Sequence, residues 1–227
     1  MESIYRRIVV AVDPDDEVGL YTLKQLAERF CERGSHLKLG LPFVLEYGVR
    51  GVREMFSVCG DHGSMVILDL KMADIGAIMR MIASKFRGAA SAVIAHAFVG
   101  YNSGLRDLKE ALDEWGVKLV LVASMSHPGS REVLDHCMER IFEVIDRTRP
   151  WGVVAPATRP TVVASVKARF PYVRILSPGV GAQGAKPGDA ICSGADYEIV
   201  GRYITKSPEP VKALDRIVEE LKRRCGG

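Results

Sequence analysis

The chain has 227 residues, 48% of them hydrophobic, and is therefore long enough to bury a substantial core. Its 31 Lys and Arg residues nearly balance 28 Asp and Glu residues, which leaves a formal net charge of +3. Neither a long basic block nor a run of interleaved aromatic and basic residues occurs, so the composition argues against nucleic acid as a partner.

Short runs typical of β-strands alternate with longer amphipathic runs along the whole chain. The first strand run ends at Asp13, and the helix expected after it places several leucines and Phe30 on one face. The expected strands cover residues 8–12, 36–39, 65–70, 92–95, 118–123, 152–155, 173–176 and 197–200. The expected helices cover about 17–33, 42–58, 75–86, 103–115, 131–145, 160–170 and 208–222.

The order of these elements predicts eight strand–helix units with a period of roughly 25 to 30 residues. Strands joined by helical crossovers pair in parallel, and eight such units in a chain of this length favour one closed (β/α)8 barrel, a TIM barrel. We expect this single domain to cover residues 1–227. A doubly wound open sheet is the alternative fold.

Polar side chains gather where the expected strands end, which is where the active site of a (β/α)8 barrel lies. They are Asp13, Lys38, Asp69, Lys71, His96, Ser126 and Arg202. Asp69 and Lys71 are two residues apart, so a β-strand would place both on one face, and Asp74 follows shortly after. Read alone, these charges would form a surface ion pair worth at most about 1 kcal/mol. Their gathering at one end of the barrel favours catalysis instead.

Two loops suit a phosphate group. The loop after the seventh strand contains the Gly-rich stretch 179–184, whose exposed backbone N–H groups permit close approach, and Arg202 follows Gly201 after the eighth strand. Phosphate binding by these two loops is a recurrent use of the barrel. No metal-ligand spacing occurs, since His96 and His127 lie in separate loops, and we expect no metal.

Five cysteines are scattered along the chain without a CxxC or zinc-ligand spacing. An odd number without a pattern predicts free thiols in a reducing compartment. The apolar run near the N-terminus is broken at Asp13, so the start of the chain resembles neither a signal peptide nor a membrane span. We therefore expect a cytoplasmic protein without membrane contact.

The residues Asp69-Leu70-Lys71-Met72-Ala73-Asp74 match the D-x-K-x-x-D motif of the orotidine 5′-phosphate decarboxylase superfamily. The chain resembles archaeal orotidine 5′-phosphate decarboxylases in particular. Further matches follow in the expected order at 38–40, 125–129, 158–160, 177–184 and 199–202. The resemblance covers nearly the whole chain and implies a cofactor-independent decarboxylase that acts on orotidine 5′-phosphate.

The resemblance also implies a role for individual residues. Lys71 would protonate C6 of the pyrimidine within a network of alternating charges formed by Lys38, Asp69, Lys71 and Asp74. In the family the second Asp of the motif comes from the partner subunit, so Asp74 implies a homodimer with shared sites. The substrate contacts would be Asp13 to a ribose hydroxyl, Ser126 to the pyrimidine amide edge, Pro178 near the base, and Gln183, Gly201 and Arg202 to the phosphate.

One departure and two alternatives accompany this interpretation. After the motif the family usually continues I-P-x-T, whereas this chain has Gly76 in place of proline and Ile78 in place of the threonine that would reach the partner's ribose. Metal-dependent sugar-phosphate decarboxylases and aldolases of the superfamily share the motif but place an acidic ligand where this chain has Lys38. A nucleotide-binding barrel without catalytic activity is the other alternative.

Overall fold

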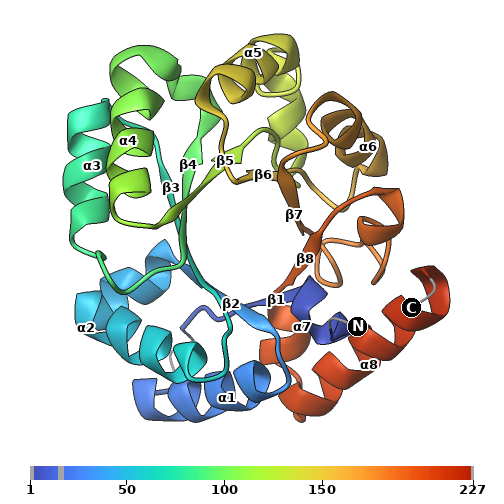
Figure 1. The fold of residues 1–227 in the computed structure, drawn as a ribbon. Coiled ribbons are helices and arrows are strands. Elements are labelled where there is room, and N and C mark those ends of the chain that lie inside the picture. The colour runs from blue at the N-terminus through green and yellow to red at the C-terminus, as the bar shows by residue number, and fades with distance from the viewer. Residues whose placement is uncertain (1–2, 15–17, 226–227) are drawn as a thin grey trace.

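The computed structural model describes residues 3–14 and 18–225, and its eight strands form a closed parallel barrel surrounded by helices (Figure 1). Each strand pairs with the next one along the chain, and β8 pairs with β1 to close the ring. The strands are β1 (Ile8–Ala11), β2 (His36–Gly40), β3 (Val66–Met72), β4 (Ala92–His96), β5 (Lys118–Val122), β6 (Gly152–Val154), β7 (Arg174–Pro178) and β8 (Tyr197–Val200). The expected (β/α)8 barrel is confirmed, and the open sheet is excluded.

Helices cover the outside of the barrel (Figure 1). The α-helices are α1 (Leu20–Glu32), α2 (Leu41–Gly60), α3 (Gly76–Ser84), α4 (Arg106–Glu114), α5 (Met138–Thr148), α6 (Pro160–Arg169), α7 (Arg202–Thr205) and α8 (Pro210–Cys225). Short helical turns are η1 (Ile4–Arg7), η2 (Ala97–Val99), η3 (Tyr101–Leu105), η4 (Pro128–Glu132) and η5 (Ile191–Ser193).

Two expectations about the helices need correction. The helix expected over 131–145 is divided, because η4 ends at Glu132 and α5 begins only at Met138. In addition, β7 is followed by a loop and the three-residue η5 rather than by an α-helix, so the eight strand–helix units are not all complete.

Apolar side chains fill both faces of the sheet, as parallel sheets require. Val9, Ile67 and Ile94 belong to the cluster inside the barrel, whereas Ile8 and Val10 belong to the larger cluster between the strands and the helices. The strands therefore read as continuous apolar runs, and a charged residue within one of them is conspicuous.

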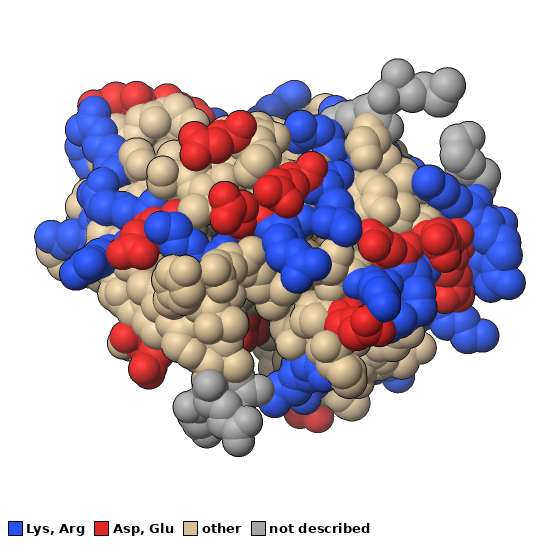
Figure 2. Space-filling model, turned by 90° about the horizontal axis from the view of Figure 1, so that it is seen from below, with Lys and Arg blue, Asp and Glu red and all other residues tan. Residues whose placement is uncertain are grey.

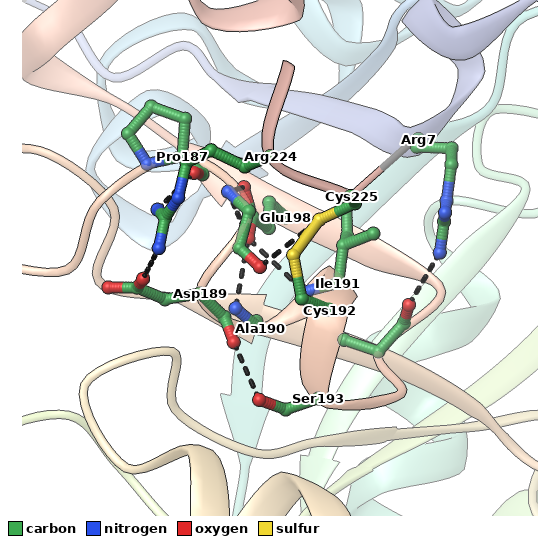
Figure 3. The surroundings of a disulfide bond; sticks show 12 residues. Arg7, Pro187, Asp189, Ala190, Ile191, Cys192, Ser193, Glu198, Arg224 and Cys225 are labelled. Carbon is green, nitrogen blue, oxygen red and sulfur yellow. Dashed lines mark hydrogen bonds and ion pairs between the residues drawn. A yellow bond between two sulfur atoms is a disulfide. The ribbon is translucent and has the colours of Figure 1, made fainter. Parts of the chain in front are cut away.

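Two disulfide bonds overturn the prediction of free thiols for four of the five cysteines. Cys31 in α1 is bonded to Cys59 in α2, and Cys192 in η5 is bonded to Cys225 at the end of α8 (Figure 3). Cys137 is free and exposed. The partners lie 28 and 33 residues apart in the chain, so no short-range spacing signals them. They meet because neighbouring elements of the barrel pack together.

The surface carries charges of both signs. Figure 2 shows Lys and Arg side chains intermixed with Asp and Glu over the face in view, without a large patch of one sign. Among the described residues, no helix combines the length and apolarity needed to cross a membrane.

The buried imidazole of His36, at the start of β2, makes the stability of the fold sensitive to acid. Its Nδ1 accepts a hydrogen bond from the backbone N–H of Met65 at 3.1 Å, an arrangement that requires the neutral ring. Burial, reinforced by the charges of Arg6 and Lys118, lowers the pKa of His36 from 6.5 to about 4. Between these two values the unfolded chain binds a proton that the folded chain does not, so stability falls as the pH falls.

We expect His36 to account for roughly 3 kcal/mol of the free energy of unfolding that is lost between pH 6.5 and pH 4. Urea unfolding of the wild-type protein and of His36→Asn across this range measures the effect. Asparagine keeps an acceptor for Met65 but does not titrate. Equal pH dependence in the two proteins would contradict the prediction.

Candidate active site

Three charged side chains meet at the carboxyl ends of β2 and β3. The Lys71 Nζ donates a hydrogen bond to Asp69 Oδ2 at 2.7 Å, and the Lys38 Nζ lies 3.2 Å from the same oxygen. Asp13, after β1, lies 4.0 Å from the Lys38 Nζ and extends the row. The side chains of Asp69 and Lys38 are buried, whereas that of Lys71 is 40% exposed.

The electrostatic balance keeps Asp69 ionised. Burial alone would raise its pKa, but the charges of Lys38 and Lys71 and the hydrogen bonds from both outweigh burial and hold the pKa below its usual value. Its second oxygen, Oδ1, is buried and has no hydrogen-bond partner among the described residues. A buried carboxylate between two ammonium groups is therefore a fixed negative charge at neutral pH.

The backbone of β3 is irregular where it carries these charges. Lys71 has a φ of 42°, in the left-handed region that side chains rarely adopt, and the pairing of β3 with β4 shifts register between Leu68 and Met72. Such a conformation costs of order 1–3 kcal/mol and persists where the surrounding structure enforces it. Asp69 and Lys71 thus come together as expected, but through a bulge rather than through simple strand alternation.

A cavity of about 250 Å³ opens beside the charged row. Lys38, Asp69 and Lys71 line it together with several apolar side chains. Ser126, His127, Met125, Pro178, Gln183, Ile94, Val122, Val154 and Ile199 complete the lining. Charges in a partly apolar cavity interact more strongly than they would in water.

A larger cavity of about 550 Å³ adjoins the first and shares Lys38, Pro178, Gln183 and Ile199 with it. Asp13, Gly201 and Arg202 line its outer part. The two cavities therefore form one groove, with the charged row in the narrow part and the phosphate candidates in the wide part. Nine of the ten residues expected at the site line this groove, and the tenth, Asp74, does not.

The Gly-rich loop after β7 is a closed turn. The N–H of Gly181 donates to the carbonyl of Ala185 at 2.8 Å, and the N–H of Ala185 donates to the carbonyl of Gly179 at 3.2 Å. Gly181 has a φ of 78°, and a Cβ there would lie 2.7 Å from the Cβ of Tyr203. Only glycine fits this position without displacing the turn, which carries Gln183 at its tip.

Arg159 holds the loop that carries Ser126, a role that the sequence does not reveal. Its guanidinium pairs with Asp135, donates to the carbonyl of Met125, and donates to Ser124 Oγ at 2.8 Å. The Ser124 hydroxyl also donates to Asp135 Oδ1 at 2.7 Å. The sequence showed only that 158–160 match the family. The partners of Arg159 come from the loop after β5 and the segment before α5.

Asp74 lies apart from the other charges of the network within this chain. It is exposed, and its Oδ1 accepts a hydrogen bond from the backbone N–H of Ile75 at 2.7 Å. Gly76 begins α3 beside α4, and a Cβ there would lie 2.7 Å from the carbonyl oxygen of Gly104. This close approach gives a packing reason for the glycine that replaces the family proline.

The histidines near the site do not form a metal-ligand set. His96 ends β4, and burial, followed by the charge of Lys71, lowers its pKa, so the ring is neutral at neutral pH. Within residues 3–14 and 18–225, the group of potential ligands close enough to share an ion is formed by Glu28 and Glu32 of α1 and His62 in the turn after α2, all exposed. It is separate from the groove, whose wall contains two lysines.

Comparison with known proteins identifies the family. The model of the orotidine 5′-phosphate decarboxylase / HUMPS family matches residues 6–217. The chain belongs to this family. An orotidine 5′-phosphate decarboxylase from Aeropyrum pernix is 52% identical over 221 residues, which cover 97% of this chain and 90% of that protein. One from Thermococcus kodakarensis is 40% identical over 217 residues, covering 95% and 96% of the two chains.

Solved structures of the orotidine 5′-phosphate decarboxylase family share the fold. The crystal structure of orotidine 5′-monophosphate decarboxylase from Sulfolobus solfataricus matches with a TM-score of 0.85 and 35% identity, covering 96% of this chain and 98% of that one. The enzyme from Methanocaldococcus jannaschii, complexed with the inhibitor BMP, has a TM-score of 0.85 at 29% identity over 95% and 98% of the chains. The resemblance inferred from the motifs is confirmed, and the chain is an enzyme of this family.

Proposed function

We propose that this chain converts orotidine 5′-phosphate to uridine 5′-phosphate without a cofactor, as a step of de novo pyrimidine biosynthesis, and that its 227 residues act as one domain. The observation that carries the proposal is the row formed by Lys38, Asp69 and Lys71 along a small cavity that apolar side chains also line. Membership of the decarboxylase family supports it.

The chemistry requires a cation at one carbon. Loss of CO2 breaks the bond between C6 and the carboxylate carbon and leaves the electron pair on C6, where no adjacent carbonyl delocalises it. The Lys71 ammonium stabilises this charge and then donates a proton to C6, and water restores the proton. Asp69, bonded to Lys71 at 2.7 Å, fixes the direction of the ammonium and lies beside the departing carboxylate.

The groove suits the rest of the substrate. The pyrimidine would occupy the narrow cavity, with its amide edge against Ser126 and its ring near Pro178. Asp13 would accept a hydrogen bond from a ribose hydroxyl. Gln183, the Gly201 backbone and the Arg202 guanidinium would hold the phosphate in the wide cavity.

We also propose a homodimer in which Asp74 completes the charge network of the partner's site. Two features of the single chain support this. Asp74 is exposed instead of contacting Lys71, and apolar side chains near the same end of the barrel are exposed too, with Ile75 62% and Phe98 58% accessible. Ile78, which replaces the family threonine, would leave the threonine's contact to the partner's ribose unmade.

We further propose a cytoplasmic location. Disulfides are compatible with it, since intracellular proteins of hyperthermophiles carry them.

The metal-dependent alternative is disfavoured by charge. Lys38, in β2, stands where the metal-dependent relatives carry an acidic ligand, and its ammonium already pairs with Asp69 at 3.2 Å. A divalent cation at this position would face repulsion from both Lys38 and Lys71.

Turnover of orotidine 5′-phosphate by purified protein in EDTA, followed by ultraviolet absorbance, tests the proposal. We expect the same rate before and after dialysis against the chelator, because every group assigned to the reaction belongs to the protein. Loss of activity in EDTA that Mg²⁺ restores would support the metal-dependent alternative. Binding of uridine 5′-phosphate without any turnover would support a non-catalytic barrel.

A further inference from the structure

The crossover from β7 to β8 is built differently from the others. Within the described residues it contains only η5, whereas each of the other six crossovers contains an α-helix. Its first part, residues 179–185, is the closed turn that carries Gln183, and its second part, residues 186–194, leads down to β8. The second part therefore determines where the end of the turn lies relative to the wide part of the groove.

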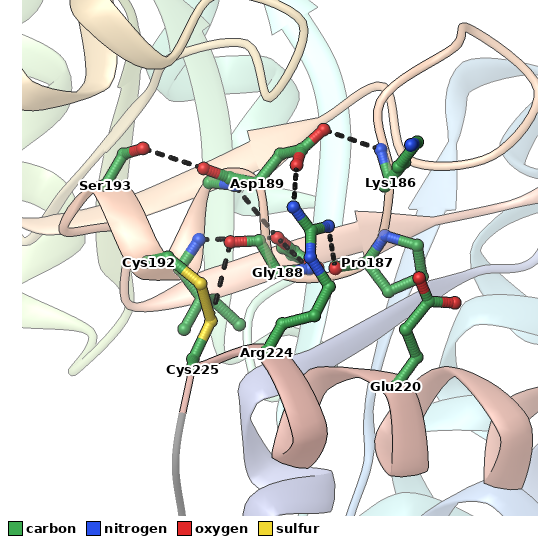
Figure 4. Close-up of polar contacts among 12 residues, drawn as sticks. Lys186, Pro187, Gly188, Asp189, Cys192, Ser193, Glu220, Arg224 and Cys225 are labelled. Atoms are coloured by element: carbon green, nitrogen blue, oxygen red, sulfur yellow. Dashed lines mark hydrogen bonds and ion pairs between the residues drawn. A yellow bond between two sulfur atoms is a disulfide. The ribbon is translucent and has the colours of Figure 1, made fainter.

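Arg224, in the last turn of α8, grips this second part (Figure 4). Its Nη1 donates to the carbonyl of Pro187, and its Nη2 donates to Asp189 Oδ1 at 2.6 Å. Asp189 Oδ2 in turn accepts the backbone N–H of Lys186 at 2.7 Å. Partial burial would raise the pKa of Asp189, but the N–H of Lys186 and the Arg224 guanidinium lower it overall. One guanidinium thus contacts Pro187 and Asp189 directly, and Asp189 extends the contact to Lys186, directly after the closed turn.

The Cys192–Cys225 disulfide ties the same segment to α8 covalently (Figure 3). Gly188 packs directly against it, since a Cβ on Gly188 would lie 3.1 Å from the Cys225 Sγ. The Gly188 N–H donates to both carboxylate oxygens of Glu198 at 3.0 Å, and Glu198, on β8, is completely buried. The segment 186–194 is therefore bonded both to β8, through Glu198, and to the end of α8, through Cys225.

We infer that Arg224 and Cys225 form a clasp that positions the phosphate-binding turn, with Arg224 as a positioning residue and the disulfide as its lock. The inference rests on the proposed function, since it assigns the turn to the substrate phosphate. Without the clasp, residues 186–194 gain conformational freedom that must be lost again when the phosphate binds, which weakens binding. This loss of affinity is expected for ligands that carry the phosphate and not for ligands that lack it.

Calorimetric titration with uridine 5′-phosphate and with uridine tests the clasp. We expect Arg224→Gln to raise the Kd for uridine 5′-phosphate about tenfold, the size of effect that follows from losing charge-assisted hydrogen bonds, and to leave the Kd for uridine unchanged. Arg223→Gln is the matched control, because it removes the same charge from the same helical turn, where Arg223 pairs only loosely with Glu220 at 3.9 Å. Arg224→Lys should recover part of the affinity.

Reduction of the disulfide provides an independent test. A dithiol such as dithiothreitol transfers two electrons and two protons to the Cys192–Cys225 bond, which yields two thiols and the cyclic disulfide of the reagent. We expect the reductant to weaken uridine 5′-phosphate binding by the wild-type protein and to have no further effect on Cys225→Ser. A continued effect on Cys225→Ser would assign the change to the Cys31–Cys59 bond and overturn the lock.

The outcomes separate the clasp from the function on which it rests. If the wild-type protein fails to bind uridine 5′-phosphate, the proposed function fails. If it binds and Arg224→Gln binds equally well, the clasp alone is wrong. Equal losses for uridine 5′-phosphate and uridine would show a general structural role and also overturn the inference. If Arg224→Gln does not fold, Arg224→Lys and the reduced wild-type protein decide the question by the same comparison.

Discussion

Replacing Lys71 by alanine is expected to lower kcat for decarboxylation by roughly 10⁴-fold or more, because the change removes both the charge that stabilises C6 and the proton donor. The two effects belong to one ammonium and cannot compensate for each other. Asp69 loses one of its two partners but keeps Lys38 at 3.2 Å, so the carboxylate is not left unpaired. The variant should therefore remain folded.

Single-turnover and steady-state rates followed by ultraviolet absorbance measure this effect, and circular dichroism checks the fold. Lys212→Ala is a suitable control, because Lys212 forms only an exposed surface pair with Glu209. A Lys71→Ala protein that retained a substantial fraction of the wild-type rate would remove Lys71 from the proposed chemistry and with it the assigned proton donor.

Mixing two inactive variants is expected to restore activity if Asp74 acts in the partner's site. In a dimer of one Lys71→Ala chain and one Asp74→Asn chain, one site carries both defects and the other carries neither. Random pairing of equal amounts makes half of the dimers mixed, so about a quarter of the wild-type activity should return. Co-expression of the two chains with different affinity tags, followed by rate measurement, tests this.

A mixture of Lys71→Ala with Asp69→Asn is the matched control. Asp69 and Lys71 are hydrogen-bonded within one chain, so both sites of that mixed dimer are defective and no activity should return. If Asp74→Asn is inactive alone and the Asp74 mixture also stays inactive, Asp74 acts within its own chain. If Asp74→Asn is fully active alone, Asp74 has no part in the reaction.

The row of charges at the strand ends could be predicted from the sequence because it depends on local pattern. Asp69 and Lys71 interrupt an apolar strand, and the parallel barrel brings Lys38 beside them through the pairing of β2 with β3. The registry of neighbouring strands is set by the same apolar pattern that identifies them. The apolar pattern of the strands therefore predicted both the fold and the position of the charged row.

Other features depend on contacts that no local pattern records. The left-handed φ of Lys71 results from a register shift against β4, and the partners of Arg159 come from segments 24 and 35 residues away. The prediction of free thiols was wrong for the same reason, since Cys31 and Cys59 meet only through the packing of α1 on α2. The sequence indicated a Gly-rich loop instead of a helix between β7 and β8, and only the count of eight complete strand–helix units was wrong there.

The second disulfide encloses the strand that closes the barrel. Residues 192 to 225 form a covalent ring that contains β8, α7 and α8, and β8 is the strand that pairs with β1. If β8 separates from β1 in a thermal fluctuation, the bond keeps the end of α8 attached to η5, just before β8, so β8, α7 and α8 stay at a high effective concentration relative to one another. A proteolytic cut between the two cysteines likewise leaves the fragment attached. A bond outside the sheet thus helps to maintain the pairing of β8 with β1 that closes the barrel.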